Sequence, residues 1–178
     1  NQILVKGVTS DQLENKHFIV HQNYTELIQG TSSNETLTGT SGNDRIEGSD
    51  NPFDRFGDGN DRLIGGEGDD LLIGGTNAHS LGGYYVDTYV FDDDSGQDQI
   101  VGFLVDGTGY VGEYYDRIEI LAGINGTDIA TSSDVLSRIS SNADGDAVID
   151  LGEDNQILVK GVTSDQLENK HFDVVHQD

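Results

Sequence analysis

The stretch that decides the fold runs from residue 57 to residue 75 and reads GDGNDRLIGGEGDDLLIGG. It belongs to a series of nine-residue units that begins at residue 30 and continues as GTSSNETLT, GTSGNDRIE, FGDGNDRLI and GGEGDDLLI. Glycine or another small residue fills most of positions one, two and four, and an acid fills position six. Position eight is always large and apolar, and the four residues there are Leu37, Ile46, Leu63 and Leu72.

This nine-residue pattern predicts a six-residue turn followed by a three-residue strand. Side chains alternate along a strand, so only the middle strand residue points inward. Successive turns then lie on opposite edges of a flattened coil. We therefore predict an all-β fold, a parallel β-roll over about residues 30–118, with less regular later units around Asp87, Asp98 and Asp116. A flexible Gly/Asp-rich linker is the alternative, but a linker has no reason to place an aliphatic residue at each eighth position.

The turns have the composition of a calcium site. Ca²⁺ takes six to eight oxygen ligands and tolerates irregular geometry, and glycines let the backbone aim its carbonyls at one point. Because turns alternate edges, each acid should meet the turn two units away. The predicted sites are Glu35/Asp61, Asp44/Asp70, which we rank strongest, Asp61/Asp87, and a weaker Asp70/Asp98. The predicted metal-site residues are Glu35, Gly39, Ser41, Asp44, Gly57, Gly59, Asp61, Gly66, Gly68, Asp70, Gly75, Asp87 and Asp98.

Composition narrows the possible partners. The 178 residues include 33 Asp and Glu against 9 Lys and Arg, for a net charge of -24, and no Cys. Such a chain repels nucleic-acid phosphates and anionic lipids, and its compaction needs cations to offset the repulsion between carboxylates. No apolar run is long enough for a membrane helix. We expect calcium as a partner, and neither nucleic acid nor membrane insertion.

Residues 1–18 recur letter for letter at 155–172, an offset of 154 positions. This repeat predicts tandem modules, with residues 1–22 as the tail of a preceding module and 23–178 as one full module. An engineered or permuted terminus is the alternative. Residues 119–178 should cap the roll, with a helix within 132–141, strands at 146–151 and 155–162 around a turn at 152–154, and a short helix at 163–167.

Insertions at about residues 49–55, 76–86 and 104–115 precede turns on one edge and carry most of the aromatic residues. Aromatic faces with a polar tip suit sugar rings or protein partners. We predict a ligand-binding surface there, or alternatively a lid in which the tyrosines pack down on the roll. Its residues are Phe53, Tyr84, Tyr85, Tyr110, Tyr114 and Tyr115, with the cations Arg55 and Arg117.

The remaining motifs predict no catalysis. No nucleophile elbow, zinc-protease helix or phosphate-binding loop is present in the sequence. His171 and His176 are spaced differently from His17 and His21 in the first copy, so we expect surface residues rather than a metal pair. Residues 142–150 approach an EF-hand loop but have Ala147 where that loop needs glycine, which favours a hairpin turn.

Together, GNDRLIGGEGDDLLIGG from residue 59, DTYVF from 87 and DRIEI from 116 closely resemble the RTX (hemolysin-type) repeat family, most clearly over residues 30–91. The resemblance implies a β-roll that folds only with calcium, secretion through a type I exporter, and a C-terminal export signal near residues 167–175. The module is also similar to R-modules of alginate C5-epimerases, which bind polysaccharide beside a catalytic module, and to repeats of large RTX adhesins. Two functions follow: a non-catalytic polysaccharide-binding module, or a structural or adhesive repeat of a cell-surface protein.

Overall fold

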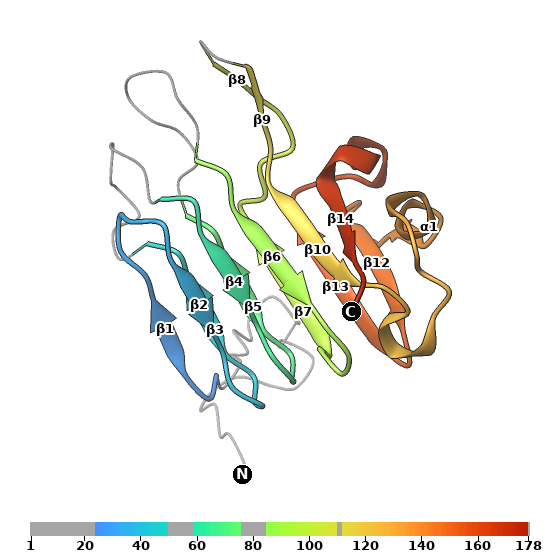
Figure 1. The fold of residues 1–178 in the computed structure, drawn as a ribbon, viewed down its shortest axis with the longest axis horizontal. Helices are drawn as coiled ribbons and strands as arrows, with labels where there is room; N and C mark the ends of the chain where they lie inside the picture. The colour runs from blue at the N-terminus through green and yellow to red at the C-terminus, as the bar shows by residue number, and fades with distance from the viewer. Residues whose placement is uncertain (1–23, 50–58, 76–84, 110–111, 178) are drawn as a thin grey trace, which may run out of the picture.

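The fold is known from a computed structural model that describes residues 24–49, 59–75, 85–109 and 112–177. Two sheets face each other across one core (Figure 1). The seven-stranded sheet has the order β1-β3-β5-β7-β13-β12-β11, and the five-stranded sheet has the order β14-β10-β6-β4-β2. A separate hairpin of β8 (Gly107–Gly109) and β9 (Gly112–Tyr114) projects beyond the sheets (Figure 1).

The nine-residue units form the roll by placing alternate strands in opposite sheets. Within each sheet these strands pair in parallel, as the repeat pattern predicts. The seven-stranded sheet receives β1 (Leu27–Gln29), β3 (Arg45–Glu47), β5 (Leu71–Ile73) and β7 (Gln97–Val101). The five-stranded sheet receives β2 (Thr36–Thr38), β4 (Arg62–Ile64), β6 (Thr88–Phe91) and β10 (Arg117–Leu121).

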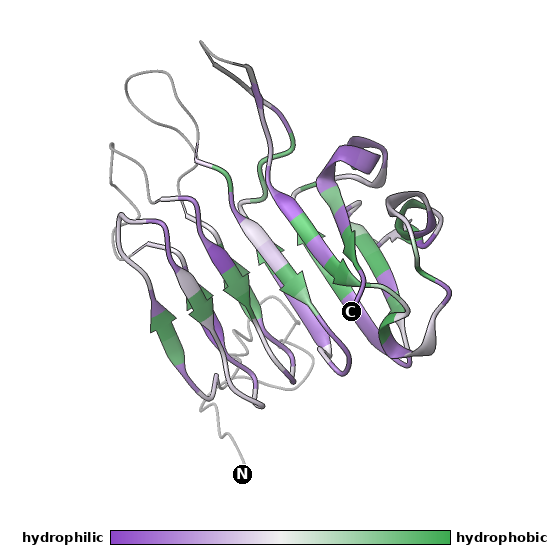
Figure 2. Cartoon of the chain, in the orientation of Figure 1, coloured by the Kyte–Doolittle hydropathy of each residue, from purple (hydrophilic) through white to green (hydrophobic). Residues whose placement is uncertain are grey.

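The position-eight residues form the core, as predicted. In one sheet Ile46 pairs with Leu72 and Leu72 with Ile100, and in the other Leu63 pairs with Tyr89 and Tyr89 with Ile118. All six side chains are fully buried. Strand residues on either side of each core residue point outward, so green and purple alternate along several strands in Figure 2.

The roll begins one strand earlier than the predicted start at residue 30. β1 lies before Gly30 and pairs in register with β3, with Leu27 opposite Arg45 and Ile28 opposite Ile46. Glu26 therefore stands at the acid position of an additional unit. The sequence did not reveal this unit because residues 21–25 read HQNYT and contain no glycine.

The C-terminal region completes both sheets. β13 (Asn155–Lys160) pairs in parallel with β7, and β12 (Ala147–Gly152) and β11 (Ile139–Ser141) follow in antiparallel order. β14 (Phe172–Val175) pairs in parallel with β10. The two predicted strands around the turn at 152–154 are confirmed. The chain is therefore an all-β parallel roll with antiparallel strands at its C-terminal end.

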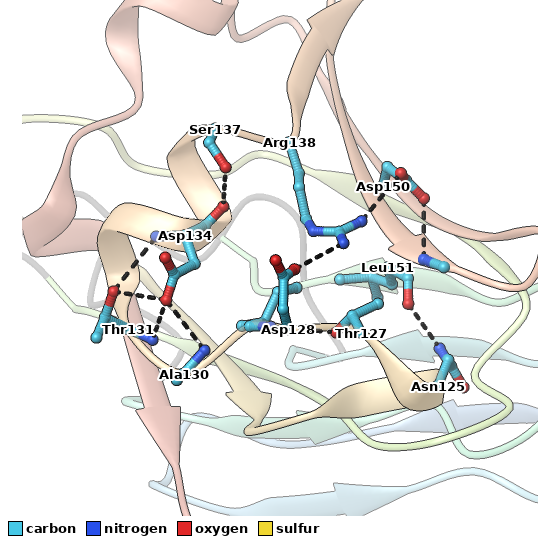
Figure 3. Close-up of polar contacts among 12 residues, drawn as sticks. Asn125, Thr127, Asp128, Ala130, Thr131, Asp134, Ser137, Arg138, Asp150 and Leu151 are labelled. Carbon is cyan, nitrogen blue, oxygen red and sulfur yellow. Dashed lines mark hydrogen bonds and ion pairs between the residues drawn. The ribbon is translucent and has the colours of Figure 1, made fainter.

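Short helices pack beside these last strands. α1 (Ser132–Leu136) begins at a capping box in which Thr131 and Asp134 bond reciprocally (Figure 3). The helix buries Val135. The predicted helix within 132–141 is confined to these five residues, because Ile139 enters β11. The remaining helices are 3-10 turns: η3 (Ile124–Gly126), η4 (Ser164–Gln166), which follows Thr163 as predicted, and η5 (Asn169–His171).

Ion pairs and a hairpin turn hold this end together. Arg138 binds Asp128 at 2.9 Å and Asp150 at 3.2 Å (Figure 3). The turn before β12 is the predicted hairpin, closed by the Asn142 N–H donating to Asp146 O at 2.9 Å. Lys160 Nζ lies 2.7 Å from Asp146 Oδ2, so this acid already has a cationic partner.

The prediction that His171 is a surface residue is wrong, whereas His176 is exposed. His171 is fully buried, with Nδ1 accepting the Glu168 N–H at 2.9 Å and Nε2 at 2.9 Å from Val105 O. Because a carbonyl can only accept, Nε2 is the donor in the second contact. The contact spans 66 residues of sequence, so local spacing contains no signal for it.

Replacing Tyr89 with Phe should destabilise the roll. The Tyr89 hydroxyl is buried and accepts the Gly74 N–H at 3.1 Å. Phenylalanine retains the ring but leaves this N–H without its partner, which costs about 1–3 kcal/mol. Urea unfolding in saturating calcium measures the change in stability. An unchanged midpoint would show that water replaces the hydroxyl.

No helix within the described ranges is long and apolar enough to cross a membrane.

Candidate metal centre

The acids of the repeat stack in two rows, one along each edge of the roll. Each acid immediately precedes a strand, except Asp98, which is the second residue of β7, so the parallel register of the strands also aligns the acids. The first row contains Glu26, Asp44, Asp70 and Asp98, and the second contains Glu35, Asp61, Asp87 and Asp116. Each edge therefore carries one acid for each turn.

Neighbouring acids in a row are joined by one repeated hydrogen bond. The Asp44 N–H donates to Asp70 Oδ1 at 2.7 Å, and the Asp70 N–H donates to Asp98 Oδ1 at 2.8 Å. On the other edge the Asp61 N–H donates to Asp87 Oδ1 at 2.9 Å. The structure thus brings together the partners of the predicted pairs, including Glu35 with Asp61 at 2.9 Å.

The rows extend beyond the residues predicted as ligands. The Glu26 N–H donates to Asp44 Oδ1 at 2.9 Å, and the Asp87 N–H donates to Asp116 Oδ1 at 2.8 Å. The DRIEI motif around Asp116 is a signal that could have placed this residue in the set. The second carboxylate oxygen of Asp116, however, accepts the Leu104 N–H at 2.8 Å. In the last turn a backbone amide therefore occupies the oxygen that would otherwise be available to a cation.

The aspartates of both rows are removed from solvent, whereas Glu26 is exposed and Glu35 is partly buried. Asp44, Asp70 and Asp98 are each at most 1% exposed, and Asp61, Asp87 and Asp116 are at most 3% exposed. Burying an ionised carboxylate is costly unless it is paired or coordinates a metal. Burial raises the pKa of Asp70 to about 7 and that of Asp98 to about 8. The folded roll therefore needs a positive charge at these positions to keep them ionised.

The second carboxylate oxygen distinguishes the turns from one another. Asp70 Oδ2 is buried and accepts no hydrogen bond from the described part of the chain. Asp44 Oδ2 instead accepts the Thr40 N–H at 2.5 Å and the Thr40 hydroxyl at 2.8 Å. Glu35 Oε2 likewise accepts the Thr31 N–H at 2.5 Å. Of these three acids, Asp70 has the oxygen available to a cation.

The turn before Asp70 has no room for side chains around that oxygen. A Cβ on Gly65 would overlap Asp70 Oδ2, and a Cβ on Gly39 would overlap Gly65 O and crowd Asp44 Oδ2. Gly66 has a φ of +97°, and its Cβ would overlap Thr40 O from the turn two units earlier. Carbonyl and carboxylate oxygens of two stacked turns therefore line one small cradle.

This oxygen-lined cradle fits a hard cation. Within the described residues no three His, Cys, Asp or Glu side chains converge on one point. Backbone carbonyls must therefore supply most ligands, which calcium accepts at ~2.3–2.6 Å with six to eight oxygens. The absence of Cys from the sequence removes thiolate ligands, which zinc and copper favour.

The other predicted metal-site residues occupy the same turns. Gly59, Gly68 and Gly75 have φ values of +94°, +108° and +114°, which fits their turn positions. Ser41 lies in the turn before Asp44 and is exposed. Gly57 lies outside the described residues.

Besides the acids at position six, the polar side chains at position five also connect the turns, which sequence reasoning missed. The Asp69 N–H donates to Asn43 Oδ1 at 3.1 Å, and the Asn60 N–H donates to Asn34 Oδ1 at 2.9 Å. Asp69 Oδ1 in turn accepts the Gln97 N–H at 3.0 Å. These side chains tie successive turns through backbone amides. Their signal was present, because Asn or Asp fills position five in all four clear units.

The predicted aromatic surface is only partly described, since Phe53, Arg55, Tyr84 and Tyr110 lie outside the described residues. Tyr115 packs down on the C-terminal region, with its ring 5.5 Å from His171 and Lys170 5.3 Å above it. Arg117 lies against the same ring and pairs with Asp173 at 2.7 Å. Tyr85 and Tyr114 are half-buried. Tyr115 therefore makes its ring contacts within the molecule.

Comparisons with known proteins give one family match over the repeats and two similar solved structures. Residues 29–51 and 57–78 match the RTX calcium-binding nonapeptide repeat family. The extracellular lipase LipA of Serratia marcescens is 20% identical over 84% of this chain and 21% of its own, with a TM-score of 0.43. The AlgE6R3 subunit of the Azotobacter vinelandii mannuronan C5-epimerase is 21% identical, with a TM-score of 0.34. The match covers 81% of this chain and 80% of that subunit.

The chain thus spans about a fifth of that lipase. No curated protein matches the sequence. The matched segments coincide with turns whose buried carboxylates and crowded glycines are described above. The chain therefore carries RTX calcium-binding nonapeptide repeats, which bind Ca²⁺, within an all-β parallel roll.

Proposed function

We propose that this chain is a structural module of an extracellular protein and that calcium drives its folding. The observation that carries the proposal is the stacking of acids, one for each turn, along both edges of the roll, with the six aspartates among them buried. Without cations these groups and the net charge of -24 oppose compaction. Calcium supplies the positive charge that offsets their burial, so the free energy of binding becomes free energy of folding.

We assign the strongest site to the cradle between the Asp44 and Asp70 turns. Asp70 would contribute Oδ2, and the carbonyls of Gly65 and Thr40 lie in the same wall. The Glu35/Asp61, Asp61/Asp87 and Asp70/Asp98 sites repeat the arrangement, because the same hydrogen bond joins the two acids of each pair. Among them Glu35 is the weakest ligand, because the Thr31 N–H already satisfies its second oxygen.

Calcium-dependent folding also fits secretion by a type I exporter. An unfolded, strongly acidic chain can pass a narrow channel, whereas the folded roll cannot. Outside the cell, where calcium is abundant, the same chain would fold and stay outside. We therefore place the protein outside the cell or on its surface, with no catalytic step assigned to the module itself. The test is a calcium titration in which bound ions and β-structure should rise together.

A second candidate function, polysaccharide binding beside a catalytic module, is favoured by the loop tyrosines. The β8–β9 hairpin projects beyond the sheets and ends at Tyr114 (Figure 1). Tyrosine rings of this kind stack on sugar rings. Arg117 is already paired with Asp173, which weakens its own attraction for an anionic glycan.

Replacing Tyr114 with Ala should reduce retention on an alginate column in calcium severalfold and leave calcium-dependent folding intact. Tyr85→Ala should act in the same direction, because both residues belong to the predicted surface. Tyr24→Ala, near the start of the roll, is the matched control. If all three variants were retained as strongly as the unsubstituted chain, the glycan proposal would be wrong and the structural one would stand.

A further inference from the structure

The two ends of the roll are covered differently. At the C-terminal end, β11, β12 and α1 extend past β13 and β14, and Val135 and Ile149 there are fully buried. At the other end, β1 and β2 are the edge strands of the described sheets. Their core residues Ile28 and Leu37 are only partly buried, whereas their register partners Ile46 and Leu63 have no exposed surface.

Large exposed apolar side chains occur only at these two ends of the described structure. Leu27, on β1, is 59% exposed, and Val175, at the end of β14, is 36% exposed. β1 and β14 lie toward opposite ends of the long axis (Figure 1). Hydrophobic groups at both ends of a stack of repeats are what a continuing array requires, because each repeat buries its apolar surface against its neighbours.

The internal sequence copy shows how these ends would be connected. Val175 precedes His176 and Gln177, as Val20 precedes His21 and Gln22. In a chain where one copy follows another, only the six residues 21–26 separate this valine from Leu27. Six residues is also the length of the turns between β2 and β3 and between β4 and β5. The connection is therefore as short as a turn of the roll itself.

We propose that successive copies of this module dock head to tail. The β1 end of one copy would pack on the β14 end of the copy before it, and the contact would bury Leu27 and the valine equivalent to Val175. The contact joins two different surfaces and does not close on itself, so it produces a linear array. Such an array is a stiff rod rather than a string of independent domains. The inference rests on calcium-dependent folding, since both ends exist only in the folded roll.

The test uses a two-copy chain in which residue 172 is followed directly by residue 19. In saturating calcium its urea-unfolding midpoint should exceed that of the single chain. Leu27→Asp in the second copy should remove this gain, with about a tenfold change in the unfolding equilibrium from loss of one buried leucine. The matched control is Leu27→Asp in the first copy, whose β1 end has no copy before it, and this should change little.

Equal effects of Leu27→Asp in both copies would overturn the proposal, because the chain's own first residues would then cover β1. No gain in the midpoint of the two-copy chain would also overturn it. Small-angle scattering gives a second measurement that does not depend on unfolding: docking predicts one fixed distance between the copies, whereas a broad distribution contradicts it. If the single chain does not fold in calcium, the proposed function itself fails, which is a distinguishable result.

Discussion

Chelating calcium with EGTA is expected to abolish most of the β-structure of this chain. Six aspartates are at most 3% exposed in the folded roll: Asp44, Asp61, Asp70, Asp87, Asp98 and Asp116. An uncompensated buried ion costs several kcal/mol, and a whole domain is stable by only about 5–15 kcal/mol. A few ionised carboxylates without cations therefore exceed the net stability. Far-UV circular dichroism and the hydrodynamic radius should report an expanded, disordered chain.

Calcium added back in excess should restore the signal, which separates loss of the ion from damage to the protein. Magnesium at the same concentration should restore it poorly. Mg²⁺ demands near-octahedral geometry at ~2.0–2.1 Å and gives up its waters reluctantly, and a cradle of backbone carbonyls suits it badly. The same ordered β signal in EGTA as in calcium would refute calcium-dependent folding.

Replacing Asp70 with Asn is expected to lower the calcium affinity more than the corresponding neutralising substitution of Asp44 or Glu35. Asparagine retains an oxygen that can accept the Asp44 N–H, which lies 2.7 Å from Asp70 Oδ1. It removes the charge and replaces Oδ2, the buried oxygen that accepts no hydrogen bond in the described structure. Calcium affinity depends on the number of charged ligands, so we expect at least about a tenfold higher midpoint of calcium-induced folding.

The matched control for this substitution is Asp69→Asn, one residue away. It removes the same charge, but Asp69 is exposed and its role is to accept the Gln97 N–H, which asparagine can also do. Asparagine already occupies the equivalent positions 34, 43 and 60. Similar shifts from both variants would mean that overall charge, rather than a ligand at Asp70, sets the calcium requirement.

The sequence by itself determined the repeating part of this protein. A nine-residue period with an apolar residue at position eight admits one inward side chain for each strand, and this determines the parallel strands, the core rows and the alternation of edges. Because both rows of acids follow from that alternation, the sequence alone predicts the partners of Asp44 and Asp61. The oxygen-rich composition then pointed to calcium.

Only the tertiary structure decided which oxygens are available and how the roll ends. Asp44 and Asp70 occupy the same position of the repeat, yet Thr40 satisfies the second oxygen of Asp44 while Asp70 Oδ2 accepts no hydrogen bond among the described residues. The extra strand β1 and the buried His171 likewise depend on contacts between residues distant in sequence. A local period specifies what repeats at each turn, whereas contacts across the fold decide where the repeat is interrupted.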